Sequence, residues 1–304
     1  MDRCSREGDD TAGLAKYDSR VDIDLPHLKQ WIGRTESFTD SISAAPLRAL
    51  AATLDRADPP PLDDEEVPPC WHWLFFLPTA RQSEIGADGH PQRGGFLPPV
   101  PLPRRMWAGS RLRWMRPLRV GRRYTRTSRI VSVDSKTGQS GPLVFVKVHH
   151  EIADETGLAL AEDQDLVYRD MPRPGDAAPA GEAAKAAYSW SRAVHPDPVL
   201  LVRYSALTFN AHRIHYDRQY ATGEEGYPGL VVHGPLLATL LLDLLRNHMP
   251  DAQVTAFSFR AMQPTFDIAP FAARGAPGAV ADTADLWVQL ADGTLAMKAT
   301  AELA

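Results

Sequence analysis

The stretch "HGPLLATLLLDLLRNHMP", residues 233–250, decides the fold of this chain. Pro235 suits the first turn of a helix, where its missing N–H costs nothing, and Pro250 ends the helix. Between them, leucines cover nearly every face of the predicted helix. A helix that is apolar all round is buried on most sides. The sequence therefore predicts a buried central helix here.

Strand-like segments follow this helix. They are "VTAFSFRAM", "DLWVQLA" and "TLAMKATAEL", and Asp292-Gly293 between the last two is a two-residue hairpin signal. The first half repeats the order, with a helical stretch at 44–55 and strand candidates within 111–170. We expect an α+β fold of two antiparallel sheets, each wrapped around a central helix. The predicted units are 20–170 and 188–304, joined by an Ala/Pro/Gly-rich linker at 171–187.

Composition limits the function. The chain has 304 residues and a formal net charge of −5, which argues against nucleic acid as a partner. Cys4 and Cys70 are the two cysteines, so neither a disulfide framework nor a zinc knuckle is expected. The polar N-terminus predicts no signal peptide, and no apolar run reaches membrane-spanning length. We expect a cytoplasmic protein without membrane contact.

Polar rings and an amide gather just before the central helix, at Asn210, His212, His215 and His233. One interpretation is structural, because a buried histidine often only satisfies backbone groups. A metal site is a second, which we disfavour since no Asp, Glu or Cys joins these histidines at a usual ligand spacing. Acid–base catalysis is the third, because imidazole moves protons near neutral pH.

Gly234 stands at the start of the central helix. The first N–H groups of a helix lack intrahelical partners and lie at its positive end. Glycine lets a ligand approach the backbone closely, so a developing enolate oxygen could be stabilised there, as in an oxyanion hole. Gly234 could instead only permit a tight entry into the helix.

These residues carry a family resemblance. The stretch "SALTFNAHRIHYDRQYA" followed by "YPGLVVHGPL" resembles the MaoC-like hydratase/dehydratase family, which has the hotdog fold. The "FNAHRIHYD" form, with "WIGRTESFTD" and "WHWLFFLPT" in the first half, resembles the branch of hydroxyacyl-thioester dehydratase type 2 and mesaconyl-C4-CoA hydratase. The resemblance spans about residues 20–304 and implies a double hotdog.

The chain departs from the family motif Asp-x-Asn-Pro-x-His. Asn210 replaces the aspartate that helps to hold or activate water, and an amide cannot take a proton. The resemblance therefore implies His215 as general base and acid, Asn210 as a residue that orients water, and the Gly234 N–H as the oxyanion donor. Arg213, His233, Gly229 and Pro228 are the predicted substrate-binding residues.

The implied reaction is reversible addition of water to an α,β-unsaturated acyl thioester, with no metal or cofactor. Coenzyme A is part of the substrate, and we expect a homodimer with one working site per chain. Ten arginines between 104 and 129 form either a solvated strand face or contacts to coenzyme A or to a free carboxylate of the acyl group. The latter predicts a short branched dicarboxylic substrate of the mesaconyl-C4-CoA or itaconyl-CoA type.

Three other functions stay open. They are an (R)-3-hydroxyacyl-ACP dehydratase of fatty-acid synthesis, a hotdog thioesterase, and a non-catalytic acyl-CoA binding protein. The aromatic cluster "CWHWLFF", 70–76, is typical of a strand in the core. The long Gly/Pro-rich segment 83–105 has the length of a lid or a binding loop, and its sequence assigns it no role.

Overall fold

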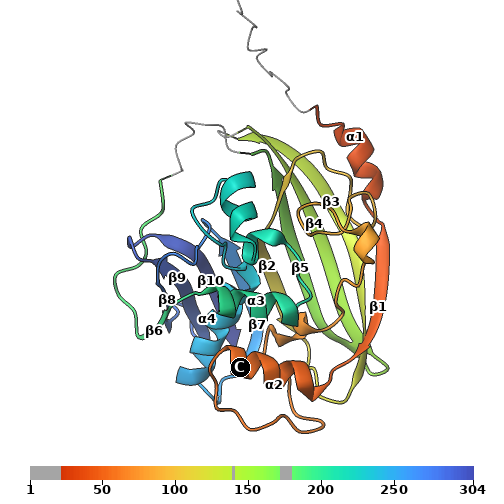
Figure 1. Ribbon diagram of the computed structural model, residues 1–304. Coiled ribbons are helices and arrows are strands. Elements are labelled where there is room, and N and C mark those ends of the chain that lie inside the picture. The colour runs from red at the N-terminus through yellow and green to blue at the C-terminus, as the bar shows by residue number, and fades with distance from the viewer. Residues whose placement is uncertain (1–21, 139–140, 172–179) are drawn as a thin grey trace, which may run out of the picture.

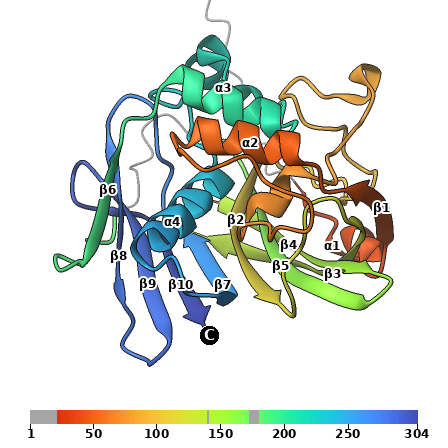
Figure 2. The same cartoon turned by 90° about the horizontal axis from the view of Figure 1, so that it is seen from below.

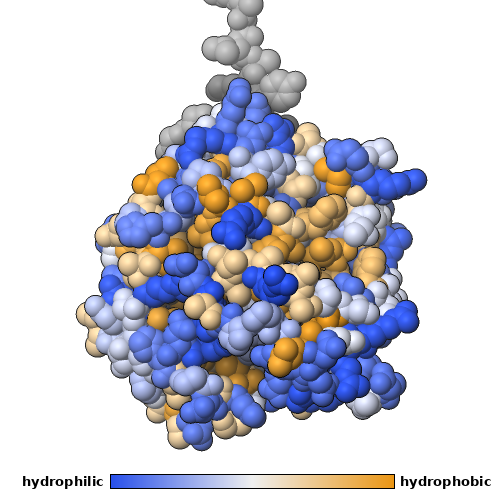
Figure 3. All heavy atoms as spheres, turned by 60° about the horizontal axis from the view of Figure 1, so that its bottom comes forward, coloured by the Kyte–Doolittle hydropathy of each residue, from blue (hydrophilic) through white to orange (hydrophobic). Residues whose placement is uncertain are grey.

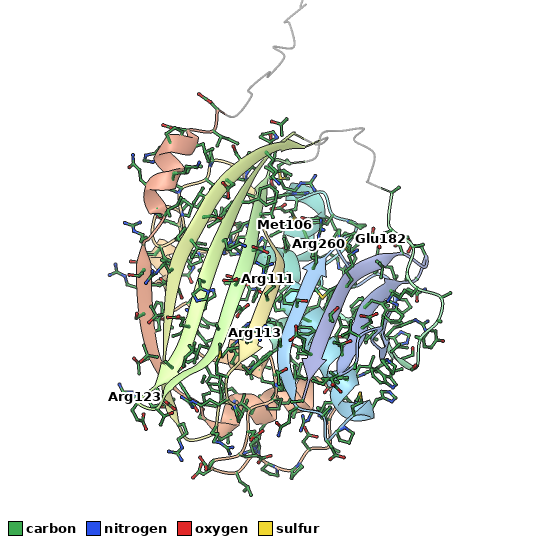
Figure 4. All side chains as sticks on the ribbon, turned by 180° about the vertical axis from the view of Figure 1, so that it is seen from behind. Met106, Arg111, Arg113, Arg123, Glu182 and Arg260 are labelled. Atoms are coloured by element: carbon green, nitrogen blue, oxygen red, sulfur yellow. The ribbon has the colours of Figure 1, made fainter. Side chains whose placement is uncertain are left out.

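The computed structural model describes residues 22–138, 141–171 and 180–304. Its frame is one antiparallel sheet of ten strands, in the order β1-β3-β4-β5-β2-β7-β10-β9-β8-β6. Helices and loops cover one face of this sheet (Figure 1), and the other face is open to solvent (Figure 4). The α+β class is as predicted.

The first half supplies one side of the sheet. It begins with the short α1 (Leu25–Leu28), and its elements in chain order are β1 (Thr35–Ser41), α2 (Ala44–Thr53), β2 (Arg104–Trp114), β3 (Arg123–Gly138), β4 (Gly141–Asp154) and β5 (Gly157–Arg169). Within the predicted strand region 111–170, residues 111–134 are divided between β2 and β3 by a turn.

The second half supplies the other side. Its elements are β6 (Trp190–Val194), α3 (Pro198–Leu207), α4 (Gly234–His248), β7 (Val254–Ala261), β8 (Phe271–Pro277), β9 (Thr283–Leu290) and β10 (Leu295–Leu303). The predicted hairpin at Asp292-Gly293 joins β9 to β10, and Gly293 has the left-handed φ of 85° that such a turn requires.

The two halves repeat the same strand order in reverse. Five strands of each half run from an outer strand, β1 or β6, to an inner strand, β2 or β7. The inner strands pair from Gly109↔Arg260 to Arg113↔Ala256. The expectation of two separate sheets is therefore corrected in this detail, because hydrogen bonds between β2 and β7 make the sheet continuous.

Helix α4 fills the second half as predicted. Its leucines are at most 5% exposed, and the helix lies between the second-half strands and a layer made by α2 and α3 (Figure 2). Asp243 is the charged residue on this apolar helix that is buried. Its carboxylate binds Arg56 of the first half at 2.5 Å and Arg192 of β6 at 2.6 Å, which satisfies the charge.

Within residues 22–138 and 141–171 of the first half no helix takes the place of α4, and here the prediction was wrong. The helical stretch 44–55 forms α2, which has the place of α3 in the order of elements and packs beside it (Figure 2). Between α2 and β2 the chain forms only short 3-10 turns at Trp71–Leu74 and Gln82–Glu84. Prolines throughout 59–103 prevent a longer helix.

The aromatic cluster is buried as expected but is not a strand. Trp71 and Leu74 belong to the first of these 3-10 turns and are at most 5% exposed. Beneath the turn lies a buried carboxylate, Glu162 of β5. It accepts hydrogen bonds from Ser110 Oγ at 2.6 Å and Trp73 Nε1 at 3.2 Å. The concave side of the first half thus has a polar interior.

The outer face of the sheet carries part of the arginine run. Arg111 and Arg113 of β2 are exposed there, beside Arg260 of β7 (Figure 4), and Arg111 pairs with Asp165 at 2.9 Å. Arg104, in contrast, is buried and paired with Glu225 at 2.8 Å. A solvated strand face therefore explains only some of these arginines. Elsewhere the surface mixes hydrophilic and hydrophobic residues (Figure 3).

The predicted division into 20–170, 171–187 and 188–304 stays a prediction. Residues 20–21 and 172–179 lie outside the described residues. The described end of the linker is attached to the β9–β10 turn, where Leu295 N donates to Glu182 O at 2.8 Å. No helix in the described ranges is both long and apolar enough to cross a membrane.

Candidate active site

The candidate residues lie between α3 and α4. After α3 the chain turns sharply, with Phe209 in the left-handed region at φ 48°. Asn210 follows, and its Oδ1 accepts the N–H of His212 at 3.0 Å, which fixes the loop. The side chain predicted to orient water therefore also shapes the backbone that presents His212 and His215.

His215 is held by its own backbone surroundings. Its ring is buried, and Nδ1 donates to the carbonyl of Val231 at 2.7 Å. This bond leaves Nε2 as the proton acceptor. Burial lowers the pKa of His215 to about 4, so the ring is neutral at physiological pH. A neutral imidazole with a free Nε2 can act as a general base.

His233 connects His215 to the helix. Its ring stacks on that of His215, with centroids 3.6 Å apart and planes at 20°, and its Nε2 lies 2.8 Å from Ser205 Oγ. Gly234, the next residue, is the first of α4. In the described part of the chain no hydrogen bond engages the Gly234 N–H. The His215 ring is thus stacked on the residue that precedes Gly234, whose N–H lies at a helix N-terminus.

A histidine of the first half completes this group. The ring of His90 packs against that of His212, with centroids 4.0 Å apart, and His212 meets His215 edge-on at 5.4 Å. Asp88 Oδ2 binds His90 Nδ1 at 3.0 Å. Sequence reasoning missed both residues. The signal was their place in the long segment 83–105, which we flagged for its length without assigning a role.

Asp88, His90 and His212 could hold a metal, since each offers one ligand atom and these atoms lie within 4.8 Å of one another. In the folded chain a carboxylate thus does join the histidines, although none does so along the sequence. The positive charge of Arg105, which adds to burial in lowering the pKa of His90, opposes a cation at this position.

The other predicted site residues lie at the margin of the imidazole group. Arg213 binds Asp217 at 2.8 Å and the carbonyl of Ala87 at 3.0 Å, so its charge is paired. Gly229, which follows Pro228, packs so tightly on Asp267 and Ile268 that a methyl group there would collide with both. These contacts give Arg213 and Gly229 structural roles, and substrate binding by them stays a prediction.

Two surface hollows lie away from the imidazoles. One follows β3 and β4 near Thr125 and Glu151, and the other lies over the β2–β7 seam near Arg111 and Ser258. The chemistry of the side chains therefore identifies the candidate site, because four histidine rings and Asp88 gather before the start of α4.

Comparison with known proteins places this site in context. Residues 70–267 match the family model described as hydroxyacyl-thioester dehydratase type 2. The mesaconyl-C(4)-CoA hydratase of Chloroflexus aurantiacus is 50% identical over 273 residues, covering 90% of this chain and 96% of that protein. The mitochondrial hydroxyacyl-thioester dehydratase type 2 of Schizosaccharomyces pombe is 29% identical over 82% of this chain and 91% of its own length.

Solved structures agree on the fold. HtdX of Mycobacterium tuberculosis superposes with a TM-score of 0.62 at 18% identity, over 88% of this chain and all of that one. A second M. tuberculosis protein, described as having a double hotdog fold, superposes with a TM-score of 0.57 at 15% identity, over 90% of this chain and 96% of its own. The expected double hotdog is confirmed.

Proposed function

Because this chain belongs to the hydroxyacyl-thioester dehydratase type 2 family, we propose that it is a hydro-lyase. It adds water reversibly to the double bond of an α,β-unsaturated acyl-CoA thioester. The observation that carries this proposal is the stacking of His215 on His233. His215 is neutral and its Nε2 is free, and His233 directly precedes Gly234, whose N–H is the proposed oxyanion donor. A general base and an oxyanion donor are the two groups that addition of water to an enoyl thioester requires.

The proposed reaction assigns a role to each group. His215 Nε2 takes one proton from water while the water oxygen bonds to the β-carbon. The electron pair of the double bond moves toward the thioester oxygen, where the Gly234 N–H stabilises the enolate. His215 then returns the proton to the α-carbon, and Asn210 orients the water. Water is the only co-reactant, so the reaction consumes no redox cofactor.

The proposed substrate is a short branched dicarboxylic acyl-CoA of the mesaconyl-C4-CoA or itaconyl-CoA type. The support is the 50% identity with mesaconyl-C(4)-CoA hydratase along nearly the whole of both chains. His233 and Arg213, with Pro228 and Gly229, are proposed to border the acyl-CoA. The second candidate is an (R)-3-hydroxyacyl-ACP dehydratase, favoured by the more distant mitochondrial relatives.

A panel of enoyl thioesters tests the function, with hydration followed by loss of the enoyl-thioester absorbance. We expect dicarboxylic CoA thioesters to react faster than crotonyl-CoA or acyl-ACP. His215→Ala should lower kcat about 10³-fold, because a general base contributes on that order. Asn210→Ala should lower it less. Equal rates on crotonyl-CoA would contradict the dicarboxylic assignment.

The other functions give different results in the same experiment. Release of free thiol, detected with DTNB, would indicate a thioesterase. Binding of acyl-CoA without turnover, and unchanged in His215→Ala, would indicate a binding protein.

A homodimer and a cytoplasmic location also belong to this proposal. Val199, Val202 and Phe209 on and after α3 expose between 47% and 61% of their surface, which supplies apolar area for a second copy. Sedimentation equilibrium should give twice the mass of one chain.

A further inference from the structure

The segment between the 3-10 turn at Gln82–Glu84 and β2 brings two polar residues of the first half to the second-half site. It folds back on itself as a small loop, in which Gly86 N donates to the carbonyl of His90 at 2.7 Å and Ile85 bridges to Pro91. Asp88 Oδ1 accepts the backbone N–H of His90 at 2.9 Å. The positions of Asp88 and His90 are therefore fixed relative to each other.

This loop is fastened to the second-half loop that carries His212 and His215. Arg213 N donates to the carbonyl of Asp88 at 2.9 Å. Gly89 has a φ of 90°, and a methyl group there would fall on the carbonyl oxygen of Ala211. Only glycine allows this approach, because any side chain would force the two loops apart.

Asp88 decides which nitrogen of His90 carries the hydrogen. Both oxygens of Asp88 are engaged by His90, Oδ1 by its backbone N–H at 2.9 Å and Oδ2 by its Nδ1 at 3.0 Å. The carboxylate is ionised and can only accept, so His90 Nδ1 donates to it and Nε2 keeps its lone pair. His215 has the same arrangement, with Val231 O in place of the carboxylate.

We propose that His90 is a second catalytic residue, which holds the attacking water together with His215, and that Asp88 is the positioning residue that fixes its tautomer. This inference rests on the proposed hydration. One hydrogen of the water is donated to each Nε2. His215 removes its hydrogen as a proton and later delivers it to the α-carbon, while the hydrogen on His90 stays on the oxygen and becomes part of the product hydroxyl.

The proposed role of Asp88 explains how the site can obtain a carboxylate although position 210 is an asparagine. Position 210 cannot supply a carboxylate, and its Oδ1 is already engaged by the His212 N–H. The Asp88–His90 pair brings a carboxylate to the same group of rings from the other half of the chain. The first half therefore supplies part of the chemistry rather than only the walls of a pocket.

Substitutions at Asp88 give a sharp test. In Asp88→Asn the single carbonyl oxygen is needed by the backbone N–H of His90, so the NH₂ group faces Nδ1 and forces the wrong tautomer. We expect kcat to fall about 100-fold or more with KM within about threefold, by analogy with the loss seen when a tautomer-fixing aspartate is amidated. Asp88→Ala, which leaves His90 free to choose either tautomer, should lose only about 10-fold.

The matched control is a carboxylate–imidazole pair on the outer face of the first half. His149 Nδ1 lies 2.8 Å from Asp163 Oδ1 on the outer face of the sheet. Asp163→Asn should leave kcat and KM unchanged. His90→Ala should lower kcat about as much as Asp88→Asn does.

A second measurement needs no turnover. In protein labelled with ¹⁵N-histidine, long-range ¹H–¹⁵N correlation at neutral pH should show His90 with its hydrogen on Nδ1, and Asp88→Asn should move it to Nε2. A hydrogen on Nε2 in the wild type would overturn the proposal. So would stoichiometric metal in the purified protein whose removal by EDTA abolishes activity, since the cluster would then be a metal centre.

The two proposals fail separately. A wild type that hydrates thioesters, with Asp88→Asn equally fast, contradicts the role of Asp88 and His90 alone. A wild type inactive on every thioester contradicts the proposed function, and the tautomer measurement still decides whether Asp88 fixes His90.

Discussion

The two halves of the sheet have the same strand order but different contents. The second half wraps around α4, whose N-terminus meets the imidazoles. The first half leaves that place to short 3-10 turns and a loop, and this loop crosses to the other half with His90. Because short turns and a loop replace a central helix in the first half, a segment of this half can reach into the site of the other.

Both halves bury carboxylates and imidazoles, but they partner them differently. In the second half burial lowers the pKa of His215 and of His233, which are neutral, and Asp243 is paired with two arginines. In the first half the carboxylate of Glu162 is surrounded by His72, Trp73 and Ser110.

The largest expected effect comes from separating the two halves at the site. Gly89→Ala places a methyl group on the Ala211 carbonyl and should push the loop outward. A displacement of about 1 Å can cost about 100-fold in rate, so we expect kcat to fall by at least that much. Gly95→Ala is the control, because the space around Gly95 is open. Equal activity of both variants would show that the first half does not contribute to the site.

A smaller effect is expected where α4 is tied to the first half. Asp243→Asn removes the buried carboxylate that Arg56 and Arg192 share, and breaking a buried ion pair costs about 3 kcal/mol of stability. Urea unfolding measures it, with Asp251→Asn, an exposed position, as the control. A loss within the error of that control would mean that the two arginines find other partners.

The smallest expected effect is a difference between the two halves in how their stability depends on pH. The pKa of His215 falls from its ordinary 6.5 to about 4, so the unfolded chain binds a proton that the native state refuses, and stability decreases as pH falls from 6.5 toward 4. Burial acts to raise the pKa of Glu162, but hydrogen bonds from His72 and Ser110 and nearby positive charge lower it from 4.5 to about 2. Its stabilisation is therefore lost only below pH 4.5.

Urea unfolding across this pH range resolves the two contributions. His215→Gln should flatten the upper window and Glu162→Gln the lower one. A slope unchanged in either variant would assign the titration to other groups.

Much of the second half could be predicted from the sequence because its signals are local. The leucines and prolines around α4 define a buried helix, and Asp292-Gly293 defines a hairpin, without knowledge of distant residues. The prediction that His215 and Gly234 share a site rests on the same kind of signal, since both belong to the stretch 208–245 of the sequence.

What the sequence could not predict depends on distant contacts. The sequence of 44–55 does not indicate whether this helix packs beside α3 or forms a central helix that the sheet wraps around, because both positions require an apolar helix face. His90 joins His212 across more than a hundred residues, and no periodicity encodes that approach. The pairing of β2 with β7 is likewise a property of two edges that meet only after each half has formed.

The seam between β2 and β7 has a consequence for how the chain folds. It pairs Gly109 with Arg260, which lie about half the chain apart, whereas neighbours such as β4 and β5 are joined by a tight turn. Closing so long a loop is entropically costly before other contacts form, so hairpins precede the seam in time. Because His90 and His215 belong to different sides of that seam, catalytic competence should be the last property that a refolding molecule regains.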